Sequence, residues 1–281
     1  MINWFLKLKT KDLITSFNND SINQSEKVLF CLFTRYGDTV IDIEVIKEFI
    51  FKYPKKNYLI LCPKQMSPYI ETLIPSIDYF AFNKRNPLSF MKAHLLLKSW
   101  SPDIAYNPWS NGLDSYYFCS YATFFRSYKD FQKPNNINHY EVVRKYLGLD
   151  SKKWTINKGT LKKNYTRVLI CPESTDHRRS MTIPEIIEII TKIKKACVCE
   201  FTIAHLNMNF KISNVSYFKF SKNANSSRKF LNLVQSSDLI VSCDSAPLHI
   251  ASALGKDLLP IFKSTNAAKV INSGSKVIEL S

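Results

Sequence analysis

This sequence lacks several features of membrane and secreted proteins. No apolar run approaches the roughly 20 residues that a membrane-spanning helix needs. The N-terminus has a short apolar core and no small-residue cleavage site, so it does not resemble a signal peptide. The seven cysteines are odd in number, and most lie inside apolar runs, as small buried side chains do. We therefore expect a protein of a reducing, cytoplasmic compartment.

Metal and hydrolase signatures are lacking too. Cys197 and Cys199 are the one close cysteine pair, and the second pair that a zinc site needs is missing. No Asp-x-Asp pair occurs in a metal-binding context. Asp244, Ser245 and His249 crowd together without a glycine-flanked nucleophile elbow, which argues against a hydrolase triad. We expect neither a metal nor a cofactor.

Acidic residues are scarce relative to basic ones. The 39 Lys and Arg residues against 23 Asp and Glu give a formal charge of +16. Such a surface attracts anions, although a lysine-rich composition that serves only solubility is the alternative. The lysines are scattered and no nucleic-acid-binding module is present, so we expect no nucleic acid partner. The apolar residues Trp4, Phe5 and Leu6 stand beside several lysines. They fit either a cap on the fold or contact with an anionic bilayer.

What the sequence does have is a repeated alternation of strand-like and helix-like segments. Lys27–Thr34 is short and apolar like a buried strand, and Asp38–Tyr53 carries its apolar residues on one helical face. The stretch Asp150–Thr166 is polar, lysine-rich and without period, so we interpret it as the linker between two domains, and the alternation restarts at Arg167–Cys171. This pattern predicts parallel sheets covered on both faces. We therefore predict an α/β fold of two facing Rossmann-like, doubly wound domains, residues 1–155 and 156–281.

The remaining segments follow the same rule. The other expected strands are Asn57–Pro63, Ile77–Phe82, Asp103–Asn107, Glu200–His205, Val215–Phe220, Asp238–Cys243, Leu258–Phe262 and Val277–Leu280. The other expected helices are Tyr69–Leu73, Pro87–Trp100, His139–Leu147, Pro184–Lys195, Ser226–Ser236 and Pro247–Leu254. An aromatic stretch, Tyr116–Phe125, shows no clear period. Because open α/β sheets bind ligands beyond the carboxyl ends of their strands, the residues that follow strands are the functional candidates.

The strongest candidate site follows the expected strand that ends at Cys243. The backbone N–H groups of Ser245 and Ala246 come just before a helix, a position that suits a phosphate. Pro247 fits the first helical turn. Asp244 has two interpretations at this point: it is part of a ligand site, or it is a helix cap worth about 1 kcal/mol.

The stretch Ser237–Thr265 resembles the C-terminal signature of the heptosyltransferase-type enzymes of glycosyltransferase family 9. In that family an aspartate and an apolar strand precede Asp-Ser/Thr-Gly-Pro-x-His, Ala-Ala-x-Gly and another strand. The matching residues are Asp238, Asp244, Ser245, Pro247, His249, Ala251, Ala253, Leu254 and Gly255. Ala246 replaces the usual glycine and loses its freedom to take positive φ, and Lys263-Ser264-Thr265 replaces Gly-Pro-Thr. The resemblance implies that this loop cradles the diphosphate of the donor.

The resemblance extends to the connection after the first strand. Gly37 and Asp38 stand where the family has Gly-Asp followed by a helix with an apolar first turn. It implies that Asp38 is the catalytic base, which takes the proton of the sugar hydroxyl that attacks the anomeric carbon. The alternative is an ordinary aspartate favoured by the dipole at a helix N-terminus.

A third resemblance lies in the segment Cys171–Ile187. Family members have a polar loop here, then a basic residue that binds donor phosphate, then a helix that begins with proline. Arg178 and Arg179 are the candidates, since arginine binds phosphate with two parallel hydrogen bonds, and a solvated arginine pair is the alternative. Ser174 and Thr175 offer hydroxyl contacts. The glutamate that often holds the donor ribose in relatives has no counterpart in residues 204–209.

Together these matches imply an inverting, metal-independent glycosyltransferase. It would move a heptose or related sugar from a nucleotide-diphosphate donor, such as ADP-heptose, to lipopolysaccharide core or a related anionic glycan. Arg35, Trp109 and Asn111 are candidates for acceptor contact, although aromatic and amide residues also suit a packed loop. Peripheral contact with the cytoplasmic face of the inner membrane would give the basic surface a purpose. The alternative is a catalytically silent nucleotide- or sugar-binding protein of the same fold.

Overall fold

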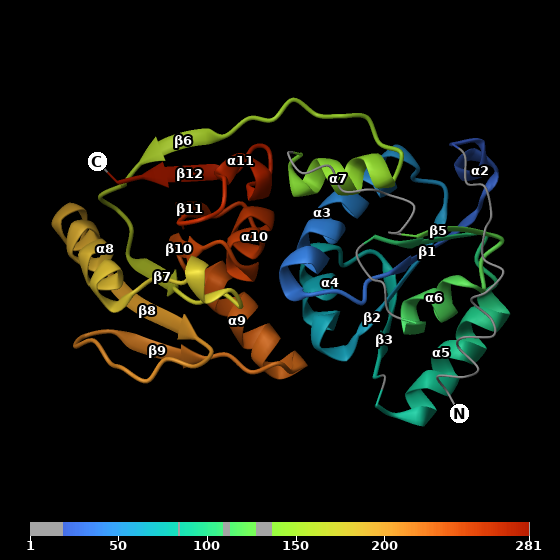
Figure 1. Cartoon of the computed structure of the whole chain (residues 1–281), viewed down its shortest axis with the longest axis horizontal. Coiled ribbons are helices and arrows are strands. Elements are labelled where there is room, and N and C mark those ends of the chain that lie inside the picture. Colours follow the sequence, from blue (N-terminus) through green and yellow to red (C-terminus); the bar gives the residue numbers. More distant parts are fainter. Residues whose placement is uncertain (1–18, 84, 109–112, 128–136, 281) are drawn as a thin grey trace. The chain divides into compact units, whose positions relative to one another are not determined.

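The computed structural model describes residues 19–83, 85–108, 113–127 and 137–280 (Figure 1). Backbone contacts divide the chain into two compact units. The first comprises Met1–Ile137 and Glu141–Ser151, and the second comprises Asn138–Tyr140 and Lys152–Ser281. The short segment belongs to the second unit because the Asn138 amide donates hydrogen bonds to two main-chain carbonyls there, at 2.7 and 2.8 Å.

The first unit is built on a parallel sheet of five strands in the order β3-β2-β1-β4-β5. The strands are β1 (Lys27–Cys31), β2 (Asn57–Pro63), β3 (Asp78–Phe82), β4 (Ile104–Asn107) and β5 (Phe124–Ser127). The helices are α2 (Asn19–Gln24), α3 (Tyr36–Lys52), η1 (Lys64–Met66), α4 (Ser67–Leu73), α5 (Pro87–Trp100), α6 (Leu113–Cys119) and α7 (His139–Tyr146), of which the first two residues of α7 are grouped with the second unit.

Side chains on both faces of this sheet are buried, as parallel strands require. Leu29 and Leu61 belong to a core shared with α5 and α6. Phe30, on the opposite face of β1, packs its ring against Phe49 of α3 at a centroid distance of 5.8 Å and stacks with Tyr106 at 5.4 Å. The continuous apolar run of β1 is therefore the signature of a strand covered by helices on both sides.

The second unit has a parallel sheet of seven strands in the order β6-β12-β11-β10-β7-β8-β9. The strands are β6 (Asn157–Thr160), β7 (Arg167–Cys171), β8 (Glu200–His205), β9 (Ser216–Lys219), β10 (Leu239–Cys243), β11 (Asp257–Ile261) and β12 (Lys276–Glu279). The helices are η3 (His177–Arg179), α8 (Ile183–Ala196), α9 (Ala224–Ser236), α10 (Ala246–Ala253) and α11 (Ala267–Val270).

Both sheets are wound in the same way. The chain builds outward from β1 to β3 in the first unit and from β7 to β9 in the second, and then returns to the other side of the first strand. The order therefore reverses between β1 and β4, and again between β7 and β10. Ligands of doubly wound sheets bind at such reversal points, beyond the carboxyl ends of the strands.

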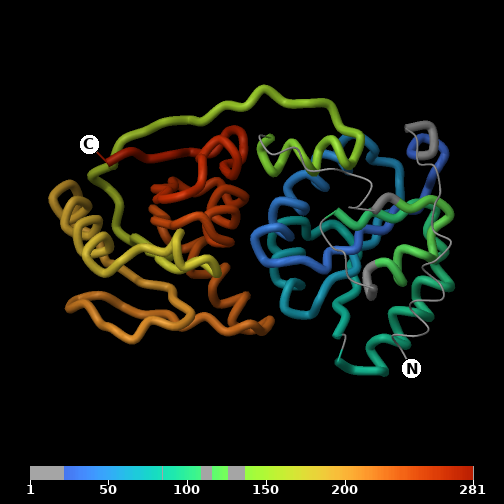
Figure 2. The backbone as a smooth tube through the Cα atoms, viewed as in Figure 1, coloured from blue at the N-terminus to red at the C-terminus, as the bar shows by residue number. Residues whose placement is uncertain are grey.

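One expectation needs correction. The stretch Asp150–Thr166 is not a structureless linker, because it contains β6, which pairs in parallel with β12 at the edge of the sheet (Figure 2). All four residues of β6 are exposed, so the strand carries no apolar pattern that the sequence could reveal.

The other compositional expectations can be compared with the structure directly. All seven cysteines are free, and six of them are buried, as expected of small apolar side chains. Among the described helices, none is both long and apolar enough to cross a membrane.

Candidate functional site

Three loops meet at the reversal point of the second sheet. Ser174 and Arg179 follow β7, Asp244 follows β10, and Thr265 follows β11. These strands are neighbours, and Ser242 pairs in register with Cys171, so the loops leave the sheet at one level. The fold thus brings together side chains that are up to about 90 residues apart in the sequence.

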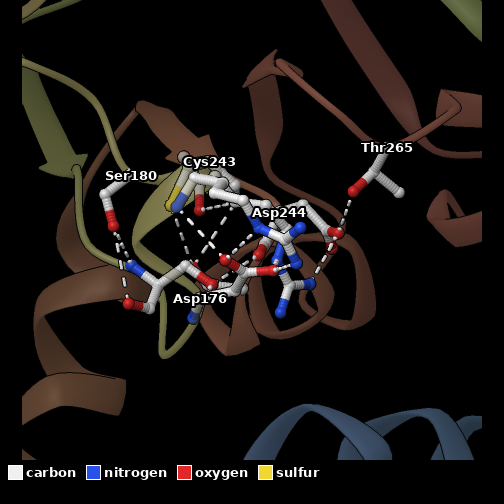
Figure 3. A network of polar contacts seen from close by, with 10 residues as sticks. Asp176, Ser180, Cys243, Asp244 and Thr265 are labelled. Atoms are coloured by element: carbon white, nitrogen blue, oxygen red, sulfur yellow. Dashed lines mark hydrogen bonds and ion pairs between the residues drawn. The ribbon is translucent and has the colours of Figure 1, made fainter.

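The buried carboxylate of Asp244 joins these loops (Figure 3). Its Oδ2 atom accepts hydrogen bonds from Arg179 Nη1 at 2.8 Å and from Thr265 Oγ1 at 2.7 Å. The main-chain carbonyl of Asp244 accepts a third bond from Ser174 Oγ at 3.1 Å. Ser245, rather than Asp244, is the N-cap of α10, and it makes no side-chain cap bond. The carboxylate is therefore turned toward the neighbouring loops.

The structure separates the two candidate arginines. Arg178 is 84% exposed and folds back on Asp176, with bonds of 3.0 and 2.8 Å to the two carboxylate oxygens. Its hydrogen bond is the main reason why the pKa of Asp176 falls to about 2. Arg179 is 27% exposed, and its ion pair with Asp244 directs it into the meeting point of the loops. Arg179 is thus the basic side chain that stands at the strand ends.

The serine and threonine of the same loop also differ. Ser174 is buried and fastens the loop, since its hydroxyl bonds to Asp244 and its N–H donates to Ser180 Oγ at 2.9 Å. Thr175 is exposed. Ser174 therefore supports the loop, whereas Thr175 is directed to solvent.

Helix α10 begins at Ala246, with Pro247 in its first turn. The first N–H groups of a helix have no partner within the helix, and here no acidic side chain lies in the first turn. Ala246 is not among the described residues with positive φ, so the replacement of the family's glycine costs nothing in backbone conformation. The N-terminus of α10 is in this respect open to an anion.

His249 lies in the same helix but is buried. Its Nδ1 atom lies 3.0 Å from the hydroxyl of Tyr140, a residue grouped with the second unit. Burial lowers the pKa of His249 to about 4, so the ring is neutral at pH 7. Its contribution to a phosphate site would be a hydrogen bond rather than a charge.

Sequence reasoning missed two polar connections around this site. Lys263 forms an ion pair with Glu185 at 2.7 Å, and this interaction is the main reason why the pKa of Glu185 falls to about 2. Glu185 also accepts hydrogen bonds from the N–H and hydroxyl of Thr182, at 2.6 and 2.8 Å, at the start of α8. The loop after β11 is thereby tied to the N-terminus of α8. In the sequence, this connection is indicated only by Lys263, which stands where the family has glycine.

The second connection involves Glu173. Its carboxylate accepts hydrogen bonds from the backbone N–H groups of Leu206 and Asn207, in the loop after β8. Residues 204–209 carry no carboxylate of their own, and Glu173 brings one to them from the neighbouring strand. In the sequence, Glu173 is indicated only by its position shortly after β7, where functional residues of such sheets are expected.

In the first unit, Asp38 lies at the carboxyl edge of the sheet. It is half-buried in the first turn of α3, the helix that follows β1. Arg35 is the exposed N-cap of that helix. Asn107 ends the adjacent strand β4, fully buried, and its N–H donates to Tyr146 Oη at 2.9 Å. Of the acceptor candidates, Trp109 and Asn111 lie outside the described residues.

Within the part of the chain that the structure describes, no group of three His, Cys, Asp or Glu side chains is arranged to hold a metal ion. Arg179, after β7, and Lys263, after β11, are basic side chains that each form an ion pair with a carboxylate near the strand ends.

Residues 228–279 match the sequence profile of glycosyltransferase family 9, described as heptosyltransferase. This segment runs from α9 to β12 and contains Asp244 and Thr265. The resemblance to glycosyltransferase family 9 is confirmed. A search of curated proteins finds no match to the chain.

Solved structures share the fold along most of the chain. A family 9 glycosyltransferase from Veillonella parvula aligns with a TM-score of 0.68 at 10% identity, covering 94% of this chain and 88% of its own. Escherichia coli ADP-heptose lipopolysaccharide heptosyltransferase II gives 0.66 at 12% identity, covering 90% of each chain. Escherichia coli heptosyltransferase WaaC, solved with ADP, gives 0.62 at 10% identity, with 90% and 92% covered. The fold is thus the α/β fold of the GT-B heptosyltransferases, with two Rossmann-like sheets.

Proposed function

We propose that this protein is a glycosyltransferase that binds a nucleoside-diphosphate sugar at the loops after β7, β10 and β11. The observation that carries the proposal is the buried Asp244 carboxylate, hydrogen-bonded to Arg179 and Thr265 at the reversal point of the sheet. Structural relatives were solved with ADP and with ADP-2-deoxy-2-fluoro heptose. We therefore propose ADP-heptose, or a closely related nucleotide sugar, as the donor.

Arg179 is the proposed diphosphate ligand. Its guanidinium is held by two carboxylates, because Nη1 donates to Asp244 Oδ2 and the buried Nε lies 3.8 Å from Asp176 Oδ2. An arginine that is oriented on one side by a carboxylate keeps donors for the oxygens of a phosphate on the other. The N-terminus of α10 would supply the backbone N–H groups of Ser245 and Ala246 and the neutral imidazole of His249, while Pro247 fixes the backbone of the first turn. In this proposal these groups stabilise the negative charge of the departing diphosphate without requiring a metal ion.

Asp38 is the proposed base. In an inverting transfer the acceptor hydroxyl oxygen forms a bond to the anomeric carbon while the bond from that carbon to the diphosphate oxygen breaks. Asp38 takes the hydroxyl proton, and the nucleoside diphosphate leaves with the electron pair. The position of Asp38 in the first turn of α3 supports this role, because the helix dipole favours the ionised carboxylate that a base needs.

The acceptor is proposed to be lipopolysaccharide core or a related anionic glycan. Arg35 is exposed beside the Asp38 turn and could bind an anionic group, and Trp109 and Asn111 are proposed to contact the sugar. In this proposal residues 1–155 bind the acceptor and residues 156–281 bind the donor. Such an acceptor implies work at the cytoplasmic face of the inner membrane.

Calorimetric titration with ADP and ADP-heptose, followed by a transfer assay, tests the proposal. We expect binding to both and transfer that survives EDTA. Ala246→Val should abolish binding, because a β-branched side chain crowds the anion's approach to the helix N-terminus, whereas Ala246→Gly should bind as well as the wild type. Equal binding by all three proteins would refute the site. Binding without transfer to any glycan acceptor would indicate a silent binding protein instead.

A further inference from the structure

Helix α5 of the first unit presents an apolar stripe to solvent. Leu88, Met91 and Leu95 are 72%, 55% and 56% exposed, although such side chains are normally buried. Their spacing of three and four residues aligns them along one side of the helix. The opposite side is anchored in the core through Ala93 and Leu97, both fully buried. The helix is therefore fixed in orientation, and the stripe faces away from the sheet.

Basic side chains border this stripe. At 100° per residue, Lys92 lies on one side of the line through Leu88 and Leu95, and Lys98 lies on the other. Both lysines are exposed, as is Arg85, just before the N-cap. No acidic residue occurs in the sequence between Asp78 and Asp103. Long cationic side chains in this position can keep their charges in water while the apolar line between them is buried.

Helix α8 also exposes apolar side chains, but it carries acidic residues that α5 does not have. Ile183 and Ile187 are 42% and 47% exposed on α8, also on one helical side. That helix carries Glu185 and Glu188, and Glu188 pairs with Lys192 at 2.9 Å. The charges on α8 are thus partly neutralised within the protein, whereas the helix residues of α5 include no carboxylate.

We propose that the face formed by Leu88, Met91, Lys92, Leu95 and Lys98 docks on the surface of an anionic lipid bilayer. Anionic headgroups supply the negative charges that pair with the lysines, which have no carboxylate beside them on α5. The boundary between headgroups and acyl chains accepts the three apolar side chains. A second copy of the chain is a poorer partner, because two chains of charge +16 would bring like-charged lysines together. The proposal uses no residue of the nucleotide site and therefore holds independently of the transferase function.

Vesicle flotation of the full chain tests this surface. Vesicles of equal parts phosphatidylglycerol and phosphatidylcholine should carry the protein upward at low salt, and vesicles of phosphatidylcholine alone should carry far less. The stripe variant Leu88→Gln/Met91→Gln/Leu95→Gln should lose at least about tenfold in apparent affinity. The charge variant Lys92→Glu/Lys98→Glu should lose a similar factor.

Two matched controls separate this face from general stickiness and total charge. Ile183→Gln/Ile187→Gln/Val198→Gln removes three other exposed apolar side chains and should bind like the wild type. Lys195→Glu/Lys229→Glu changes the net charge by the same amount at exposed positions of the second unit, and should retain most of the binding. Circular dichroism establishes that each variant is folded. If the stripe variant does not fold, the comparison between the two lysine pairs decides.

Three results would overturn the proposal. The first is a wild-type chain that does not float with anionic vesicles. The second is equal loss of binding in the α5 variants and their controls, which would mean that total charge or general hydrophobicity is responsible. The third is sedimentation velocity that shows a wild-type dimer broken by the stripe substitutions, which would assign the face to a second copy of the chain.

Discussion

The two sheets share one winding pattern but equip their reversal points differently. The relevant connections are the one from β1 to α3 in the first unit and the one from β10 to α10 in the second. In the first unit, the first turn of α3 carries its own carboxylate, Asp38. In the second, the first turn of α10 carries Ala246 and Pro247 and no acidic side chain. The positive N-terminal end of the α3 dipole therefore interacts with the carboxylate of Asp38. The corresponding end of α10 has no acidic side chain in its first turn and can interact with an external anion.

The charges around the two points follow the same division. At the second, Arg179 and Lys263 approach the strand ends, each held by a carboxylate that is itself bonded to a threonine. Such pairs fix cations in place before a ligand arrives, which lowers the ordering cost of binding. At the first, a carboxylate stands at a helix N-terminus, where the ionised form is favoured. One fold thus provides a proposed anion-binding site and a proposed base.

The strongest test of this division is Asp38→Asn. The substitution keeps the size of the side chain and its compatibility with the helix turn but removes its ability to accept a proton. We expect the transfer rate to fall by at least about 100-fold, the usual scale of general base catalysis. Nucleotide affinity should stay within about twofold, because the proposed nucleotide site is built from residues of the second unit. Steady-state kinetics and calorimetry measure the two quantities.

Asp78→Asn is the matched control, since Asp78 is an exposed carboxylate in β3 of the same unit. It should leave both transfer and nucleotide binding unchanged. If Asp38→Asn turned over at a near-normal rate, Asp38 would be an ordinary helix-terminal aspartate, and the base would have to be sought elsewhere.

A smaller effect is expected from the arginines of the second unit. Arg179→Met should weaken nucleoside diphosphate binding by about 10- to 100-fold, because a charge-assisted hydrogen bond is worth about 1.5–3 kcal/mol. Arg178→Met should change affinity by less than about threefold, since that side chain is exposed and paired with Asp176. Calorimetric titration of both variants compares adjacent residues of the same charge. The reverse ranking would mean that the loop changes register when the nucleotide binds.

Much of the fold could be predicted from local pattern. The expected bounds of β2, α5, β7 and β8 agree with the structure to the residue. The alternation of apolar strands and amphipathic helices determines these elements, because each strand is buried on both faces. Elements that bury little or that are short gave no such signal. The edge strand β6 is fully exposed, and the stretch that contains β5 and α6 is so uniformly aromatic that no period is visible.

The candidate site could be predicted only in part. The loop at Asp244 and the residue Asp38 were predicted from a motif, and the same family resemblance implied a basic residue after β7. Which arginine stands at the strand ends depends on side-chain pairing across 65 residues, which no local pattern encodes. The same holds for the pair of Lys263 with Glu185. His249 was expected to be a site residue, but its burial follows from packing against Tyr140, a residue far away in the sequence.

The burial of His249 leads to the prediction with the smallest effect. Its pKa is about 4 in the folded chain, mainly because burial disfavours the charged ring, against an ordinary value of 6.5. Below pH 6.5 the unfolded chain gains a proton that the folded chain refuses until about pH 4. Stability is therefore lost as the pH falls through this window, and no such loss occurs above it. Between pH 7 and 5.5 this one group should lower the free energy of unfolding by about 1 kcal/mol.

Urea unfolding of the wild type and of His249→Gln at the two pH values isolates this contribution. The variant has no imidazole at this position, so its stability should fall by about 1 kcal/mol less than that of the wild type over the same pH interval. The ring protons of His249 should also show no titration above about pH 5 in NMR spectra. A midpoint near pH 6.5 would mean that the ring is hydrated and accessible. His249 could then bind a phosphate as a cation at mildly acidic pH. The reversal point of the second sheet would in that case carry a pH-dependent positive charge, in contrast to the carboxylate of Asp38 at the first.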